Sequence, residues 1–293
     1  MTDNMNIQWY PGHMTKTRRQ IEADLKLVDA VCEIVDARIP VSSRNPDIDA
    51  ICGDKPRMIV LNRMDLADPA ATKKSAIGRG AEYFRRKGMA VIATDCKSKK
   101  GISAFTPAAR LACAEKLERD AKRGMNRPLR VMVVGIPNVG KSTLINQISG
   151  RKSAKAENRP GVTRGKQWVT VDSGLQLLDT PGILWPKFED PEVGMMLAYT
   201  GAVKEGVIDL EELAYRLMEL LHKFYPQTLL ERYKVEAPEG TPGWQLLEMA
   251  GRKRGYLVSG GEVNTERMAK VLLDEFRSGK LGNFTLEMPE DMV

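Results

Sequence analysis

The sequence predicts an α/β domain followed by a C-terminal domain made only of helices. Short apolar runs of the kind found in buried strands alternate with helix-like segments as far as residue 186. One of these runs leads into a glycine-rich loop and then a helix, the arrangement of a phosphate-binding loop. Beyond that point apolar residues recur at helical spacing and strand patterns stop. We therefore expect two domains, at residues 1–186 and 187–293.

The first domain contains six segments with the composition of strands. Four are buried strands by composition: VDAVCEIVDA (28–37), RMIVLN (57–62), MAVIAT (89–94) and LRVMVVG (129–135). KQWVTVDS and LQLLDT, between residues 166 and 180, favour a two-strand pair. Helical patterns then follow in VGMMLAYTGAV, LEELAYRLMELLHKFY and ERMAKVLLDEFR.

Composition narrows the class of protein. Lysine and arginine number 45 against 38 acidic residues, so the net charge of +7 favours a polyanionic partner, although a basic soluble surface is the alternative. The four cysteines have no CxxC spacing, which argues against a zinc site or disulfides and favours reduced core thiols. No apolar run reaches the roughly 18 residues of a membrane span, and the N-terminus lacks a signal-peptide pattern. A cytoplasmic protein without a membrane partner is expected.

The segment GIPNVGKST, residues 135–143, fits the pattern G-x-x-x-x-G-K-[ST] between a strand and a helix. Glycines let the backbone approach phosphate closely, and the N–H groups at the helix N-terminus attract it. We expect Lys141 to reach the outer phosphates and to act in catalysis, and the Ser142 hydroxyl to bind Mg²⁺. The expected nucleotide contacts here are Gly135, Asn138, Val139, Gly140, Lys141, Ser142 and Thr143.

Two further segments fit the same site. LLDTPG (177–182) ends a strand in Asp179, which can hold Mg²⁺ through a water, while the Gly182 N–H faces the γ-phosphate. PGVTRG (160–165) puts Thr163 where a switch segment can close on Mg²⁺. Each segment alone is compatible with an ordinary loop.

LNRMD, residues 61–65, has the strand-Asn-x-x-Asp form of a guanine-binding segment. The carboxylate of Asp65 can accept from the N1–H and the 2-amino group of guanine, whereas adenine lacks this donor pair, so GTP is favoured over ATP. Asn62 and Arg63 belong to the same grip. TDCKSKKGI (94–102) resembles the loop beneath guanine, where an N–H near Cys96 or Lys97 meets the base oxygen. The alternative for each piece is a surface turn.

The order of these motifs is unusual, because the base-binding segments precede the phosphate-binding loop. This order predicts a circularly permuted Ras-like P-loop GTPase domain, in which RGMNRP (123–128) joins the original ends. The new break follows DTPG, so the segment that senses the γ-phosphate leads into the helical domain. Nucleotide state and domain orientation are therefore expected to be coupled.

Taken together with this order, seven segments resemble those of the bacterial ribosome biogenesis GTPase A family. They are WYPGHMTK (9–16), DARIP (36–40), GIPNVGKST, PGVTRG, DTPG, GYLVSGGEVN (255–264) and FRSGKLGNF (276–284). The resemblance implies a GTPase using GTP, GDP and Mg²⁺ that binds the large ribosomal subunit precursor and its rRNA in its GTP state. It further implies particle-stimulated hydrolysis, release afterwards, and a monomer off the ribosome. Arg63 departs from the lysine usual in N-K-x-D, with a modest expected effect on affinity.

Hydrolysis leaves a gap, because Ile183 stands where Ras-like enzymes have the glutamine that orients water, and Leu184 follows it. The resemblance gives the role to His13; a helix-terminal or packing histidine is the alternative. His222, on a helical face, is expected to be structural. Asn138 matches an asparagine that binds K⁺ in related GTPases, or else only shapes the loop.

Basic residues of the helical domain form the expected RNA surface: Arg252, Lys253, Arg254, Arg277 and Lys280. Solvated charged faces are the alternative. Two rival functions stay open at this stage. One is a GTPase acting on another RNA or on the small subunit, and the other is a GTP-binding signalling module with negligible intrinsic hydrolysis.

Overall fold

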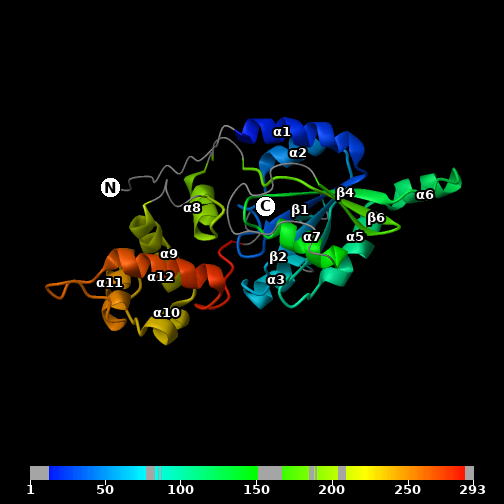
Figure 1. Ribbon diagram of the computed structural model, residues 1–293. Coiled ribbons are helices and arrows are strands. Elements are labelled where there is room, and N and C mark those ends of the chain that lie inside the picture. The colour runs from blue at the N-terminus through cyan, green and yellow to red at the C-terminus, as the bar shows by residue number, and fades with distance from the viewer. Residues whose placement is uncertain are drawn as a thin grey trace.

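The computed structural model describes residues 13–76, 83–84, 86, 88–150, 167–184, 188, 190–203 and 209–287, with the backbone alone at 13–17. A twisted sheet with helices on both faces forms one part, and a group of helices lies beside one edge of it (Figure 1). We call these helices, from α8, which starts at Pro191, to α12, which ends at Ser278, the helical lobe. The expected domain boundary at 186/187 lies outside the described residues and stays a prediction.

Among the described residues the sheet has six strands, in the order β3-β2-β1-β4-β6-β5. Their bounds are β1 Ala30–Asp36, β2 Arg57–Asn62, β3 Ala90–Ala93, β4 Leu129–Gly135, β5 Gln167–Asp172 and β6 Leu175–Asp179. Neighbours pair in parallel except β5 with β6, which form an antiparallel pair. All six predicted strands are confirmed, with ends that shift by one or two residues.

The strand order confirms the circular permutation. β4, which carries the phosphate-binding loop, lies in the middle of the sheet between β1 and β6. The strands β1 to β3 come earlier in the chain and yet extend the sheet on one side of β4. In the parallel register Asp36 lies opposite Asn62, and Val133 lies opposite Asp179. The predicted motifs therefore meet at one edge, formed by the carboxyl ends of the parallel strands.

Helices α1 (His13–Asp24) and α2 (Pro46–Cys52) cover one face of the sheet (Figure 1). Between these helices and the sheet lies an apolar core that includes Ile21, Ile48 and Met132. Farther along the chain, helix α3 (Pro69–Ala76) follows the LNRMD segment. Alternate strand residues point to opposite faces, so the strands, buried on both sides, read as continuous apolar runs.

The opposite face carries α5 (Phe105–Ala112) and α7 (Lys141–Ser149). Phe105 and Leu144 are fully buried there with Val133 of β4. Helix α6 (Ala114–Lys122) follows α5 and extends away from the sheet (Figure 1). Short 3-10 turns at Leu25–Leu27 and Ile102–Ala104 complete this half.

The helical lobe contains α8 (Pro191–Tyr199), α9 (Leu210–Phe224), α10 (Pro226–Tyr233), α11 (Gly243–Lys253) and α12 (Thr265–Ser278). Side chains of Asp190, Asp209 and Asn264 cap α8, α9 and α12 by accepting from the first free N–H groups. Leu217, Leu246 and Phe276 belong to a core shared among α9, α11 and α12. The predicted helical pattern is confirmed for these helices.

Two expectations from composition can be compared with this fold. The four cysteines are free and buried, as expected of core thiols. Within the described part of the chain, no helix combines the length and apolar character that a membrane span requires.

Candidate nucleotide-binding and hydrolysis site

The phosphate-binding loop connects the end of β4 to the start of α7. Gly140 has a φ of 95°, in the left-handed region that glycine adopts without strain. A Cβ at this position would collide with the side-chain amide of Asn62. The first N–H groups of α7 have no partner within the helix, so this helix end can bind an anion.

Lys141 and Ser142, at the start of α7, lie beside Asp179 at the end of β6. Lys141 Nζ is 2.5 Å from Asp179 Oδ1, and Ser142 Oγ donates to Oδ2 over 3.4 Å. Both members of the ion pair are buried, with relative exposures of 6% and 1%. A hydroxyl beside a carboxylate offers the hard oxygen donors that Mg²⁺ prefers. Two of the predicted magnesium residues therefore lie together, and their chemistry fits the ion.

The segment after Asp179 folds back onto the phosphate-binding loop. Gly182 lies so close to Pro137 that a Cβ added to Gly182 would come within 2.9 Å of the Pro137 Cα. The Ile183 N–H donates to the Gly135 carbonyl over 3.1 Å. The side chains of Ile183 and Leu184 are buried in separate apolar cores. Neither side chain can orient a water, as the sequence predicts.

The Asn62 side chain links the base-binding segments to the phosphate-binding loop. Its Nδ2 donates to the Val139 carbonyl over 2.8 Å. Its Oδ1 accepts from Thr94 Oγ1 at 3.0 Å and from Cys96 Sγ at 3.3 Å. The Asn62 side chain is 2% exposed, and it joins its own segment to the phosphate-binding loop and to the loop after β3. Contact with the base is therefore left to neighbouring residues.

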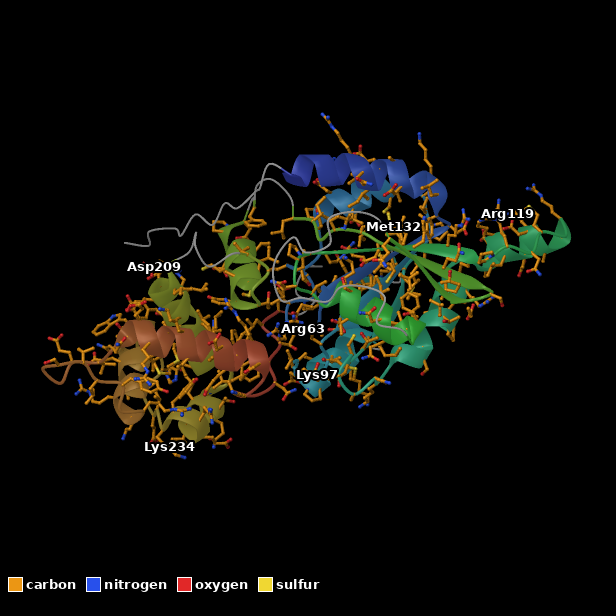
Figure 2. All side chains as sticks on the ribbon, viewed as in Figure 1. Arg63, Lys97, Arg119, Met132, Asp209 and Lys234 are labelled. Atoms are coloured by element: carbon orange, nitrogen blue, oxygen red, sulfur yellow. The ribbon has the colours of Figure 1, made fainter. Side chains whose placement is uncertain are left out.

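Arg63 reaches the phosphate-binding loop from the other side. Its φ is 60°, and its guanidinium donates to the Asn138 carbonyl and lies 3.9 Å from the Asp36 carboxylate. Burial lowers the pKa of Arg63, although the Asp36 carboxylate opposes that shift. Figure 2 shows Arg63 at the edge of the sheet that faces the helical lobe. Arg63 therefore bonds directly to the phosphate-binding loop.

The Asp65 carboxylate lies near the surface beside Lys97. Lys97 Nζ is 3.4 Å from Asp65 Oδ2, and the two side chains are 74% and 23% exposed. An exposed ion pair of this kind stabilises a protein by about 0–1 kcal/mol, so a ligand can replace it at little cost. The carboxylate predicted to bind guanine is therefore accessible.

The loop after β3 is shaped by Asp95, which the sequence analysis missed. Its carboxylate accepts from the N–H groups of Lys97 at 2.7 Å and Ser98 at 3.2 Å, and from the Ser98 hydroxyl. Burial raises the pKa of Asp95, but these hydrogen bonds outweigh burial and lower it. Since the Lys97 amide is already bonded, the Cys96 amide is the better candidate for the base oxygen. An aspartate just after a strand, followed by serine, is a turn signal that could have identified it.

A second group outside the predicted set lies at the end of β1. The Arg38 guanidinium donates to both carboxylate oxygens of Asp36, at 2.9 and 2.8 Å, and both side chains are at most 2% exposed. Burial by itself raises the pKa of Asp36, but the Arg38 charge and hydrogen bonds outweigh it and lower that pKa. Arg38 also lies over the Phe276 ring of the helical lobe, 5.2 Å from its centroid. DARIP therefore joins the two halves of the molecule.

Three residues considered in the sequence analysis are not found at the nucleotide site: two fall wholly or partly outside the described residues, and His222 lies in the helical lobe. Thr163 falls outside the described residues. His13 is the first residue of α1, and its side chain is likewise undescribed. His222 Nε2 lies 3.0 Å from the Pro238 carbonyl inside the helical lobe, which supports the structural role expected for it.

The five predicted RNA-binding residues differ in exposure. Arg252, Lys253 and Lys280 are exposed. Arg277, by contrast, donates from Nε to the Tyr199 carbonyl and from Nη2 to the Ala198 carbonyl, at 3.0 and 2.9 Å. This geometry corrects the expectation for Arg277, because its guanidinium is used at the C-terminal end of α8.

Arg254 is also turned inward from the exposed basic residues. Its guanidinium lies over the Tyr233 ring, 5.2 Å from the centroid, and 3.4 Å from the Glu275 carboxylate. Arg254 shares the Glu275 carboxylate with Arg232, which donates to both of its oxygens. The exposed basic surface is smaller than the sequence suggests.

Comparisons with known proteins agree with this site. A family model described as 50S ribosome-binding GTPase matches residues 130–227. Ribosome biogenesis GTPase A of Priestia megaterium is 44% identical over 290 residues, covering 98% of each chain. The protein of the same name from Thermotoga maritima is 32% identical and covers 98% of this chain and 96% of its own.

The chain belongs to the ribosome biogenesis GTPase A family. Solved structures agree with this membership. A GDP-bound structure of YlqF superimposes with a TM-score of 0.67 at 28% identity, covering 93% of this chain and 100% of that one. A GNP-bound YlqF from T. maritima gives 0.62, also at 28% identity, covering 94% and 99%. The predicted family resemblance and permuted fold are confirmed.

As a member of the ribosome biogenesis GTPase A family, the chain is a GTPase that binds GTP and GDP. GTPases of this class typically bind their nucleotide with Mg²⁺, and Ser142 and Asp179 offer it oxygen donors.

Proposed function

We propose that this GTPase binds a precursor of the large ribosomal subunit in its GTP-bound state and leaves it after hydrolysis. One observation carries the proposal: Asn138 Nδ2, in the phosphate-binding loop, donates to the Gly201 carbonyl just after α8, over 2.7 Å. A rearrangement of the loop on hydrolysis would therefore alter a direct contact with the helical lobe. The names of the relatives and the 50S description of the family model support a ribosomal target.

In this proposal the nucleotide lies along the carboxyl edge of the sheet. Asp65 accepts from the two guanine donors, and the Cys96 amide donates to the base oxygen. The amides of residues 138–143 and the Lys141 ammonium bind the phosphates, so Lys141 exchanges part of its contact with Asp179 for the nucleotide. Ser142, Thr163 and, through water, Asp179 hold Mg²⁺, which neutralises phosphate charge when bound.

We assign the positioning of the attacking water to His13. The Ile183 side chain is buried and has no polar atom, so another side chain has to hold the water. His13→Ala should then bind GTP and the particle normally and lose about 10²-fold to 10⁴-fold of particle-stimulated hydrolysis. Single-turnover hydrolysis on saturating particles measures this. A rate within about threefold of wild type would return His13 to a packing role.

The rRNA contact in this proposal uses the exposed basic residues of the lobe, Arg252, Lys253 and Lys280. Replacing Arg252 and Lys253 by alanine should weaken particle binding and reduce the salt slope by about one for each lost phosphate contact. Arg119→Ala, on exposed helix α6 far from the lobe (Figure 2), is a control for net charge. An unchanged salt slope in the double variant would mean that this surface faces solvent.

Three finer points belong to the same proposal. Residues 1–186 and 187–293 act as two domains, and the protein is a monomer off the ribosome.

Asn138 binds an activating K⁺ through its side-chain oxygen, in addition to its amide contact with Gly201. Hydrolysis should then be faster in potassium than in sodium salts, and equal rates would remove the K⁺ role.

Sedimentation of a lysate with a non-hydrolysable GTP analogue or with GDP tests the main proposal. Co-migration with large-subunit precursors only in the analogue supports it. Association with the small subunit or free RNA would favour a different RNA target, and no association would favour a signalling module. Asn138→Gly keeps the positive φ and removes the side chain, so it should bind GTP but lose the difference between the two nucleotides.

A further inference from the structure

The chain after α12 leaves the helical lobe and lies against the base-binding segment. Asn283 Nδ2 donates to the Asp65 carbonyl over 2.5 Å and to the Ala67 carbonyl over 3.3 Å. The Phe284 N–H donates to the Leu66 carbonyl over 3.0 Å. Thr285 Oγ1 accepts from the Asp68 N–H over 3.2 Å. Three consecutive residues therefore bind the backbone of four consecutive residues more than 200 positions away.

The same segment is anchored in the helical lobe. The Phe284 side chain is 1% exposed and stacks on Phe276 of α12 with 5.7 Å between ring centroids. Its ring also meets Tyr225 edge to face, at 5.0 Å. The Tyr225 hydroxyl donates to the Thr285 carbonyl over 2.9 Å and accepts from the Thr285 N–H over 3.1 Å. The backbone of residues 65–68 is thus hydrogen-bonded to a segment that is packed into the lobe.

The other side of the base-binding segment is held within the GTPase half. The Met64 N–H donates to the Thr94 carbonyl over 3.1 Å, and the Leu66 N–H donates to the Arg63 carbonyl over 2.9 Å. These bonds leave the Asp65 and Ala67 carbonyls to the C-terminal segment. The Asp65 carboxylate itself is not used by Asn283, so it stays available to a ligand.

We propose that Asn283 is a positioning residue for guanine recognition. By holding the main chain on both sides of Leu66, it fixes the direction in which the Asp65 carboxylate points. Two parallel hydrogen bonds to guanine need this direction within about 10–20°. The inference rests on the role of Asp65 in guanine binding given under "Proposed function".

This arrangement also links base binding to the position of the helical lobe. The free energy by which the nucleotide orders residues 65–68 favours docking of the C-terminal segment, and docking favours the nucleotide equally. The contact at Asn138 links the phosphate side to the lobe, and Asn283 links the base side independently of it.

The test compares binding of GDP and inosine diphosphate to the full chain. Inosine lacks the 2-amino group, so wild type should prefer GDP by about 10-fold or more, the value of one hydrogen bond to a charged group. Asn283→Ala should reduce this preference about 2-fold to 10-fold, because a misdirected carboxylate loses the bidentate geometry. Asn283 is exposed, so the variant should fold, and a thermal melt checks that. Thr285→Val, similar in shape but without the hydroxyl acceptor, should have a smaller effect in the same direction.

Control variants separate the possible outcomes. Ser278→Ala, at the end of α12, loses a hydroxyl that donates to the Glu275 carbonyl within the lobe, and its preference should equal that of wild type. Asp65→Ala should abolish the preference; if wild type shows none and this variant changes nothing, the assignment of Asp65 has failed. If Asp65 controls the preference but Asn283→Ala leaves it unchanged, or weakens both nucleotides equally, the positioning role is overturned.

Discussion

The phosphate side and the base side of the nucleotide site differ in what holds them together. On the phosphate side, Lys141 contacts Asp179 and the Ile183 N–H bonds to Gly135, so the partners lie at the ends of the adjacent strands β4 and β6 or shortly after them, all within residues 135–183. On the base side, Asp65 to Asp68 are bound by residues 283–285. The phosphate side is built locally, whereas the base side depends on the C-terminal end of the chain.

This difference explains how a permuted chain can keep a working site. The phosphate-binding loop and DTPG stay in one continuous stretch, so their contacts survive the change of order. The base-binding segments come before that stretch in the chain and are separated from it by α5, α6 and residues 123–128. Asn62 and Arg63 connect the two through hydrogen bonds to the Val139 and Asn138 carbonyls. The helical lobe then supports the base side from outside.

The largest expected effect comes from removing Arg38, which pairs with Asp36 at the end of β1 and lies over the Phe276 ring of the lobe. Arg38→Ala leaves Asp36 buried without its bidentate partner, with only Arg63 at 3.9 Å, and should lower the free energy of unfolding by about 3–5 kcal/mol. Denaturant unfolding measures the loss. Arg19→Ala, on the exposed side of α1, is the matched control and should change stability little. A loss below about 1 kcal/mol would mean that the Arg38–Asp36 pair contributes no more to stability than an exposed salt bridge does.

The next effect tests whether the phosphate side acts on its own. Lys141→Met should lower the rate of GTP hydrolysis about 10²-fold to 10³-fold, because one preorganised charge on the phosphates is removed. The preference for binding GDP over inosine diphosphate should remain, since Lys141 does not contact the base in this proposal. Single-turnover assays with Lys122→Ala, exposed on α6, as the control decide this. A rate within threefold of wild type would contradict the role.

A smaller effect is expected from the base side alone. Asp65→Asn should weaken GTP binding by about 1–3 kcal/mol and favour xanthosine triphosphate, whose ring carries oxygen in place of the 2-amino group. Lys97→Ala, which removes only the exposed partner of Asp65, should bind GTP nearly as wild type does. Equilibrium titrations with both nucleotides measure the shift, and unchanged GTP affinity in Asp65→Asn would refute the assignment of LNRMD.

The smallest expected effect concerns pH. The pKa of Asp36 is lowered in the folded state, so its contribution to stability is present above the unfolded pKa of about 3.9 and is lost as pH falls further. The unfolding free energy of wild type should therefore fall more between pH 5 and pH 3 than that of Asp36→Asn. Parallel denaturant titrations measure the difference, and identical slopes would show that Asp36 does not titrate with folding.

The sequence by itself determined the six strands, the phosphate-binding loop and the permuted order, because each is set by residue types within a short stretch. The same holds for the lack of a water-orienting glutamine, which Ile183 makes plain. These features come from local backbone preferences and alternating or helical burial, and neither depends on a distant partner.

Only the tertiary structure decided how Arg38, Arg277 and Asn283 are used. In the sequence, Arg277 and Lys280 are equivalent basic residues, yet one donates to carbonyls of α8 and the other is exposed. Asn283 and Asp65 are 218 positions apart, and no local pattern reports that they meet. A hydrogen bond forms wherever folding brings donor and acceptor within reach, so the use of a polar side chain is fixed by the packing of the whole chain.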